Sequence, residues 1–207
     1  MGDFMSKEDR VYFESELLKE LKGLEWPGLS IKAVKGGVKF RWEKKLVAEL
    51  DFQYLVNSNA YVLNGIVFGG PIFDCSSEVN PPYKSNLGSA ACFSFTTSGR
   101  QDKKFGTSIY GTISVPKRED AGAICAHIRR ALESHYVPLM AGCILPSART
   151  IDDVLASPTD YAYPALFIHC AVAYNSGIIS SENLEKVKLN KKIIKNKDFD
   201  LGLLSSL

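Results

Sequence analysis

The spacing of apolar residues in this chain of 207 residues changes near residue 117. From about Leu29 to Val115, apolar and polar residues alternate between turn signals, which is typical of β-strands. From about Arg118 onward, apolar residues recur at helical spacing. One amphipathic helix is also expected before the strands, over residues 6–24. A β-rich middle between helical ends predicts an α+β fold.

The strand region predicts an antiparallel β-meander. Alternating runs at 29–33, 38–42, 46–53 and 60–68 follow one another closely, and Gly36-Gly37 between the first two is a hairpin signal. Further strands are expected over 90–97 and 105–115, which makes about six strands in total. Because such a sheet usually has one covered face, we expect the C-terminal helices to pack on one face of it.

The C-terminal half predicts a series of capped helices. Ala121, Ile124, Ile128 and Leu132 share one helix face, and Pro138 should end or kink that helix. A buried helix over 165–175 and a basic helix over 181–194 are expected next. Residues 196–207 lack clear periodicity, so we expect a tail that is either flexible or docked through its leucines. Without repeats or a clear linker, residues 1–207 are predicted to form a single domain.

Composition excludes several classes of protein. The net charge of +2 is too small to indicate nucleic-acid binding, and the N-terminus lacks the apolar region of a signal peptide. No apolar run reaches the ~18 residues of a membrane-spanning helix, so a cytoplasmic location is expected. The five cysteines form no CxxC pair, and we expect them to be reduced and to pack as small apolar side chains.

No strong catalytic, metal or cofactor motif is present. His127 and His135 are eight residues apart, whereas helical metal pairs normally use a spacing of four. His169 and Cys170 are adjacent on a predicted helix, where neighbouring side chains point about 100° apart. We therefore expect no catalytic residue, no metal site and no cofactor. The lysine-rich stretch 186–197 is expected to be mainly a solvated helix face, with a phosphate or acidic partner as the alternative.

The stretch from Gly69 to Gly88 is rich in glycine, proline and asparagine and predicts a long loop. Loops of this length in compact domains are often functional. Residue type and expected exposure make this loop and the polar turn near residue 100 the predicted partner-binding surface. The candidate partner-binding residues are Asp74, Glu78, Tyr83, Lys84, Arg100, Asp102 and Lys103.

The order of these elements resembles that of small bacterial immunity proteins, which neutralise polymorphic toxins such as those of contact-dependent growth inhibition systems. The resemblance covers the N-terminal helix, the meander with Phe40-Arg41-Trp42 and 49–52, and the capped helices with 157–164. It implies a non-enzymatic protein that binds a toxin domain. Inhibitors of nuclease toxins are often acidic, and this slightly basic chain departs from that pattern.

Two other functions remain open at this stage. A small-molecule enzyme or ligand carrier would have a pocket between the sheet and the C-terminal helices, and His135 and Cys170 would be the first residues to examine. A structural or regulatory module of a larger assembly would instead expose an apolar patch for a neighbouring subunit.

Overall fold

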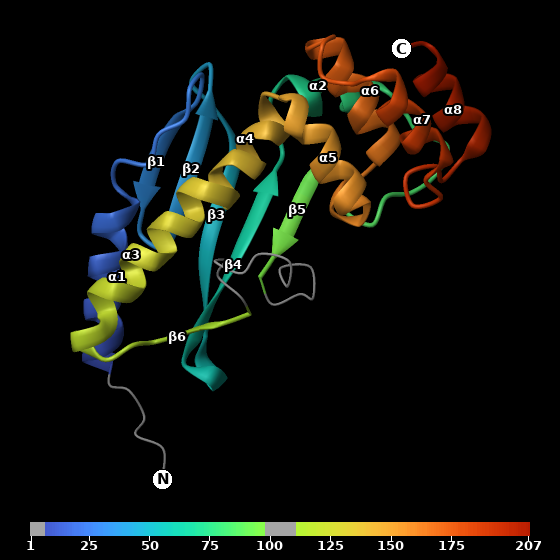
Figure 1. The fold of residues 1–207 in the computed structure, drawn as a ribbon. Coiled ribbons are helices and arrows are strands. Elements are labelled where there is room, and N and C mark those ends of the chain that lie inside the picture. Colours follow the sequence, from blue (N-terminus) through green and yellow to red (C-terminus); the bar gives the residue numbers. More distant parts are fainter. Residues whose placement is uncertain (1–6, 98–110) are drawn as a thin grey trace. The chain divides into compact units, whose positions relative to one another are not determined.

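A computed structural model describes residues 7–97 and 111–207 of the chain (Figure 1). Within these residues the fold is α+β, with an N-terminal helix, an antiparallel sheet and C-terminal helices, as the sequence predicts. The chain divides into two compact units: unit 1 is Met1–Gly65 with Phe95–Pro138, and unit 2 is Ile66–Ser94 with Leu139–Leu207. The expectation of a single domain stays a prediction.

The sheet contains six described strands in the order β1-β2-β3-β4-β5, and β6 also pairs with β4. The Val34↔Gly37 pair closes the first hairpin. Gly36 lies in its turn, as predicted, and has a positive φ of 82°. The strands are β1 (Ser30–Val34), β2 (Gly37–Trp42), β3 (Lys45–Leu55), β4 (Ala60–Val67), β5 (Phe93–Thr96) and β6 (Ile113–Ser114). The predicted meander is therefore confirmed, although most of the last predicted strand lies outside the described residues.

The turn between β2 and β3 has no glycine. Glu43 and Lys44 both have positive φ, at 47° and 69°, which is the left-handed backbone that a two-residue hairpin turn requires. Arg41 Nη1 donates a hydrogen bond to the Lys44 carbonyl at 3.0 Å and holds this turn. Because neither turn residue is glycine or asparagine, turn chemistry gave little indication of this hairpin in the sequence.

The core of unit 1 is built around two helices that lie side by side, α1 (Lys7–Leu21) and α3 (Arg118–Ala131) (Figure 1). Phe13 and Leu17 of α1 are buried, as are Cys125 and Ile128 of α3. These positions recur three or four residues apart, as the faces of packed helices do. Helix α1 also contacts β1 and β2 of the first hairpin, in which Val38 and Phe40 are buried as well.

Arg129 of α3 caps the C-terminal end of α1. Its Nη1 donates to the Glu20 carbonyl at 2.6 Å and the Lys22 carbonyl at 3.0 Å, and its Nη2 donates to the Gly23 carbonyl at 3.2 Å. The last carbonyls of a helix have no partner within the helix, and a cation there also opposes the negative end of the helix dipole. Glu133 orients the guanidinium through a 2.9 Å hydrogen bond from Nε.

A π turn lies in the middle of a long helical run. Helix α3 continues through η3 (Leu132–Tyr136), which is π-helical, into α4 (Val137–Ile144), and Pro138 lies within the run. Pro138 therefore does not end the helix. Proline lacks an N–H and collides with the carbonyl four residues earlier in a regular α-helix, and the wider π turn just before it relieves this conflict.

Unit 2 is mainly helical, and two of its helices were not expected from the sequence. Helix α2 (Pro71–Glu78) occupies the first half of the predicted long loop, and α8 (Lys197–Ser205) occupies the predicted tail. The other elements of this part are α5 (Ala148–Ala156), the 3₁₀ turn η4 (Pro158–Asp160), α6 (Pro164–Tyr174) and α7 (Ser181–Leu189). Within the described residues, no helix is both long enough and apolar enough to cross a membrane.

We predict that Arg129→Met lowers the free energy of unfolding by about 2 kcal/mol, because it leaves helix-end carbonyls without their charged donor. Urea denaturation followed by circular dichroism measures this change. The neighbouring Arg130→Met is a matched control, since Arg130 is exposed and makes no hydrogen bond or ion pair among the described residues. Equal effects of the two substitutions would contradict the capping role of Arg129.

Candidate functional site

Helix α2 is too short to be stable alone and depends on contacts with the rest of unit 2. It begins at Gly70, whose φ of 98° suits glycine, and has Pro71 in its first turn. Its N-cap residue is Gly70, which has no side chain that could cap the helix. Ile72 is fully buried, and α2 packs against α6. The position of α2 is therefore set by tertiary anchors rather than by its own helical propensity.

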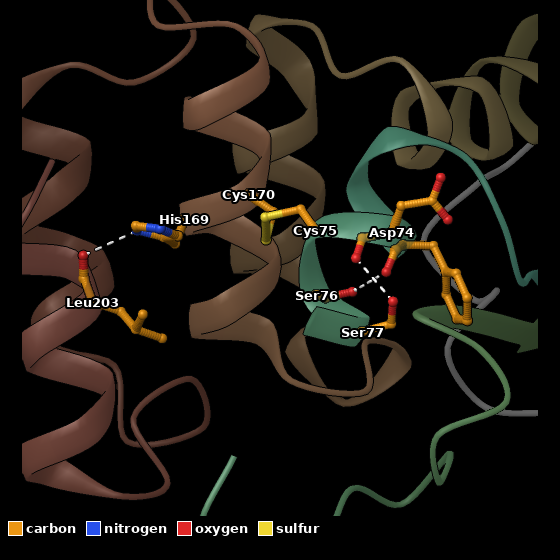
Figure 2. The surroundings of a disulfide bond; sticks show 8 residues. Asp74, Cys75, Ser76, Ser77, His169, Cys170 and Leu203 are labelled. Atoms are coloured by element: carbon orange, nitrogen blue, oxygen red, sulfur yellow. Dashed lines mark hydrogen bonds between the residues drawn. A yellow bond between two sulfur atoms is a disulfide. The ribbon is translucent and has the colours of Figure 1, made fainter. Parts of the chain in front are cut away.

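The first anchor is a disulfide between Cys75 of α2 and Cys170 of α6 (Figure 2). The two Cα atoms are 5.9 Å apart, and the cysteines are separated by 95 residues in sequence. The expectation that all five cysteines are reduced is therefore wrong for this pair. A bond between residues so far apart leaves no spacing signal, because only nearby pairs such as CxxC can be recognised in a sequence.

The remaining cysteines are buried thiols. Burial raises the pKa of Cys92 and of Cys125 to about 12, and it raises the pKa of Cys143 well above its ordinary value. A thiol that stays protonated near neutral pH is a poor nucleophile, so these three behave as apolar side chains, as the sequence predicts. Cys75 differs from them because it is partly exposed. Among the described cysteines, the Cys75–Cys170 bond is therefore the one that a reductant or another thiol would reach first.

His169 and Cys170 point to different neighbours of α6, as expected for adjacent helical residues. Figure 2 shows Cys170 directed at α2 and His169 directed at Leu203 of α8. His169 Nδ1 lies 3.2 Å from the Leu203 carbonyl oxygen. Because a carbonyl only accepts, this geometry requires the tautomer with a proton on Nδ1. The two residues therefore fix α6 between α2 and α8 rather than facing one another.

The second anchor holds the segment 79–92 that follows α2. The Tyr83 hydroxyl donates a 2.7 Å hydrogen bond to Oδ1 of Asp200, which is fully buried in α8. The Tyr83 ring also meets Tyr163 and Phe199 edge-on, at centroid distances of 5.5 and 6.3 Å. Burial, followed by the hydrogen bond to the Asp200 carboxylate, raises the pKa of Tyr83. Tyr83, a predicted partner-binding residue, is thus half-buried and bonded within the chain.

Asp200 bonds to two further groups. Its Oδ2 accepts from the backbone N–H of Lys195 at 2.7 Å and of Asn196 at 2.9 Å. Three donors therefore satisfy this buried carboxylate, which would otherwise be costly to bury. They also tie segment 79–92 to the chain between α7 and α8. Sequence reasoning missed Asp200, since one aspartate near a helix start is ordinary and its partner Tyr83 is 117 residues away.

A cavity of about 210 Å³ lies between α2, segment 79–92 and α6. Phe73 and Phe167 contribute apolar surface to its wall, and Asn80 and Ser89 contribute polar groups. Ser76 and Ser77 also line it, but their hydroxyls donate to backbone carbonyls three residues earlier, at 3.0 and 2.8 Å (Figure 2). The cavity is therefore mixed in character and large enough for one side chain of a partner or a small organic molecule.

Three of the predicted partner-binding residues are charged side chains of α2 and of segment 79–92. Asp74, Glu78 and Lys84 are exposed, and none forms an ion pair within the described residues. We call Asp74, Glu78, Lys84 and the cavity of about 210 Å³ the α2 surface. The other candidate residues, Arg100, Asp102 and Lys103, lie outside the described residues.

The described part of the chain contains no group of three histidine, cysteine, aspartate or glutamate residues placed to hold a metal ion. His135 lies in the π turn of unit 1, and Cys170 is in the disulfide of unit 2. Comparisons with protein-family models, with curated proteins and with solved structures found no match for this chain.

We predict that Cys75→Ala/Cys170→Ala lowers the free energy of unfolding by about 4 kcal/mol, because the bond closes a loop of 95 residues in the unfolded chain. Urea denaturation with and without a dithiol reductant measures the effect. Reduction should lower the stability of the wild type to that of the variant and should leave the variant unchanged. A wild-type midpoint that does not respond to reductant would contradict the prediction.

Proposed function

We propose that this chain is a non-enzymatic protein-binding module and that the α2 surface is its recognition site. The single observation that carries the proposal is the double anchoring of this surface, by the Cys75–Cys170 disulfide and by the Tyr83–Asp200 hydrogen bond. Surfaces that are already ordered lose less conformational entropy on binding than mobile loops do. Two anchors on a short helix and its following segment are consistent with a preformed binding surface.

The residues of the α2 surface suit a protein partner. Binding energy in protein interfaces is concentrated in a few anchors that enter pockets, surrounded by a rim of polar and charged groups. The cavity beside Phe73 and Phe167 would receive one apolar or aromatic anchor. Asp74, Glu78 and Lys84 would form the rim, where unpaired charges of both signs favour a partner with a complementary pattern.

The resemblance in element order to immunity proteins suggests the class of partner. Under this proposal the partner is a toxin domain, which the α2 surface occludes by covering about 800 Å² on each side. A small-molecule carrier is the second candidate function. The cavity favours it, because mixed polar and apolar walls also suit a small organic ligand.

The cytoplasmic location expected from the sequence is part of the proposal for the toxin-binding role. The disulfide weighs against it, since disulfides persist mainly in oxidising compartments. Acid trapping of the native protein, followed by alkylation under denaturing conditions, shows whether the bond between Cys75 and Cys170 is formed or reduced in the native compartment. Three reactive thiols before reduction and five afterwards would show that the bond is formed in the native compartment and would argue against a cytoplasmic location. Five thiols from the start would indicate that the bond is not formed in the native compartment.

Affinity capture from the native source at physiological salt, followed by mass spectrometry, identifies the partner, and titration then gives its affinity. We predict that Asp74→Lys/Glu78→Lys weakens the complex at least about tenfold, because both rim charges are reversed. Asp152→Lys is the control, since Asp152 is another exposed acid of unit 2 without an ion pair among the described residues. Unchanged affinity of the double variant would refute the α2 surface as the recognition site.

A second pair of variants tests the cavity. Ser89 lines the cavity and its neighbour Ala90 does not, although both are exposed. Ser89→Trp should therefore fill the cavity and weaken the captured complex, whereas Ala90→Trp should have little effect. If a small organic molecule co-purifies with the wild type and is lost only from Ser89→Trp, the carrier function replaces the protein-binding one.

A further inference from the structure

A second cavity in unit 2, of about 250 Å³, has a more cationic lining than the cavity of the α2 surface. Its wall comes from residues 83–86, from the region of η4 and the start of α6, and from Lys195 just before α8. Two of the lining residues, Lys84 and Lys195, are cationic, and none of the described residues that line it is an aspartate or a glutamate. The lining therefore combines two positive charges with polar and apolar neighbours.

The two lysines form no ion pair among the described residues. Both are exposed, and neither ammonium group has a carboxylate partner among the described residues. By contrast, Lys186 and Lys188 of the same basic stretch pair with Glu182 at 2.8 Å and with Glu185 at 3.2 Å. Lysines of this stretch on α7 thus form ion pairs, whereas Lys195, which lines the cavity, does not do so among the described residues. An anion entering the cavity would not have to displace a carboxylate from either lysine.

The same buried carboxylate positions both lysine-bearing walls. Asp200 accepts from the hydroxyl of Tyr83, the residue next to Lys84, and from the backbone N–H of Lys195 itself. Since one side chain bonds to both walls, the backbones that carry Lys84 and Lys195 are held at a fixed separation. The Asp200 charge is itself taken up by three donors, so it does not pair with either ammonium group. One cavity is thus lined by two lysines whose backbone segments are held by the same carboxylate.

Neutral donors accompany the charges. The Ser85 Oγ accepts from the Leu87 N–H at 3.0 Å, which leaves its O–H to donate, and the Asn86 amide belongs to the same wall. Phosphate groups offer several acceptor oxygens around one centre, and lysine binds them as a point charge. The cavity is larger than a phosphate alone, and Pro158, Ala162 and Pro164 add apolar surface for an uncharged part of a ligand.

We propose that this cavity binds a small molecule carrying a phosphate group, with Lys84 and Lys195 as its charge partners. The ligand's phosphate would lie between the two ammonium groups and accept hydrogen bonds from Ser85 and Asn86. Its uncharged part would rest on the proline-lined wall. This site shares Lys84 with the rim of the α2 surface. It differs from the proposed recognition site in using neither Asp74 nor Glu78, and its second charge partner, Lys195, is not part of the α2 surface.

Isothermal titration with inorganic pyrophosphate tests the proposal on the full chain. We expect saturable binding to the wild type, about a hundredfold weaker binding to Lys84→Gln/Lys195→Gln, and little change in Lys191→Gln/Lys192→Gln. The second double variant is matched, because it removes two exposed and unpaired lysines of the same stretch that do not line the cavity. Thermal melting of each variant confirms that it is folded.

Three outcomes would overturn the proposal: no saturable heat with the wild type, equal weakening in both double variants, or equally tight binding of citrate. The second would indicate diffuse attraction to the lysine stretch, and the third would indicate a site without preference for phosphate. Asp74→Lys/Glu78→Lys should leave pyrophosphate binding unchanged. Failure of this proposal and failure of the α2 surface as a recognition site are therefore distinguishable.

Discussion

The buried carboxylate of Asp200 is the interaction on which the arrangement of unit 2 depends. A carboxylate removed from water is tolerated only when its oxygens are satisfied by donors, and here the donors are Tyr83, Lys195 and Asn196. They come from two stretches that are far apart in the sequence, so few other arrangements of these stretches would satisfy it. Asp200 also lies in the first turn of α8, where the helix dipole favours a negative charge.

Two kinds of anchor hold neighbouring parts of the α2 region. A covalent bond fixes α2 to α6, whereas a hydrogen bond and ring contacts fix the segment that follows α2. The first depends on the redox environment and the second does not. Segment 79–92 contributes residues to both cavities, so one length of chain takes part in both proposed binding sites. The order of this segment is therefore the common requirement of the two proposals.

Regular periodicity made much of the fold predictable. The alternation of apolar residues in β1 to β4, the helical stripes of α1 and α3 and the almost wholly apolar sequence of α6 reflect local geometry that a sequence records directly. Helix α2 was missed because glycine and proline at its start also signal a loop. Helix α8 was missed because a short helix with few buried residues shows little periodicity; Leu204 and Asp200 are its buried members.

The candidate site was only partly predictable for a different reason. Exposure and residue type directed the partner-binding prediction to the region of Asp74 and Tyr83, but the two anchors that order this region join residues about a hundred positions apart. Such pairings are decided by tertiary packing, and a single sequence does not record them. Tyr83 shows the consequence: tyrosine in a loop suggests an interface, yet here its hydroxyl is bonded within the chain.

The π turn at Leu132–Tyr136 has a consequence for the phase of the helix that follows it. Each residue advances an α-helix by about 100°, and a π turn accommodates one residue more than a regular turn. Without that residue, the sequence of α4 would be rotated by about a quarter of a turn, and a different set of side chains would face inward. The buried set now includes Met140, Ala141 and Ile144. The extra residue of the π turn thus determines which side chains of α4 are buried.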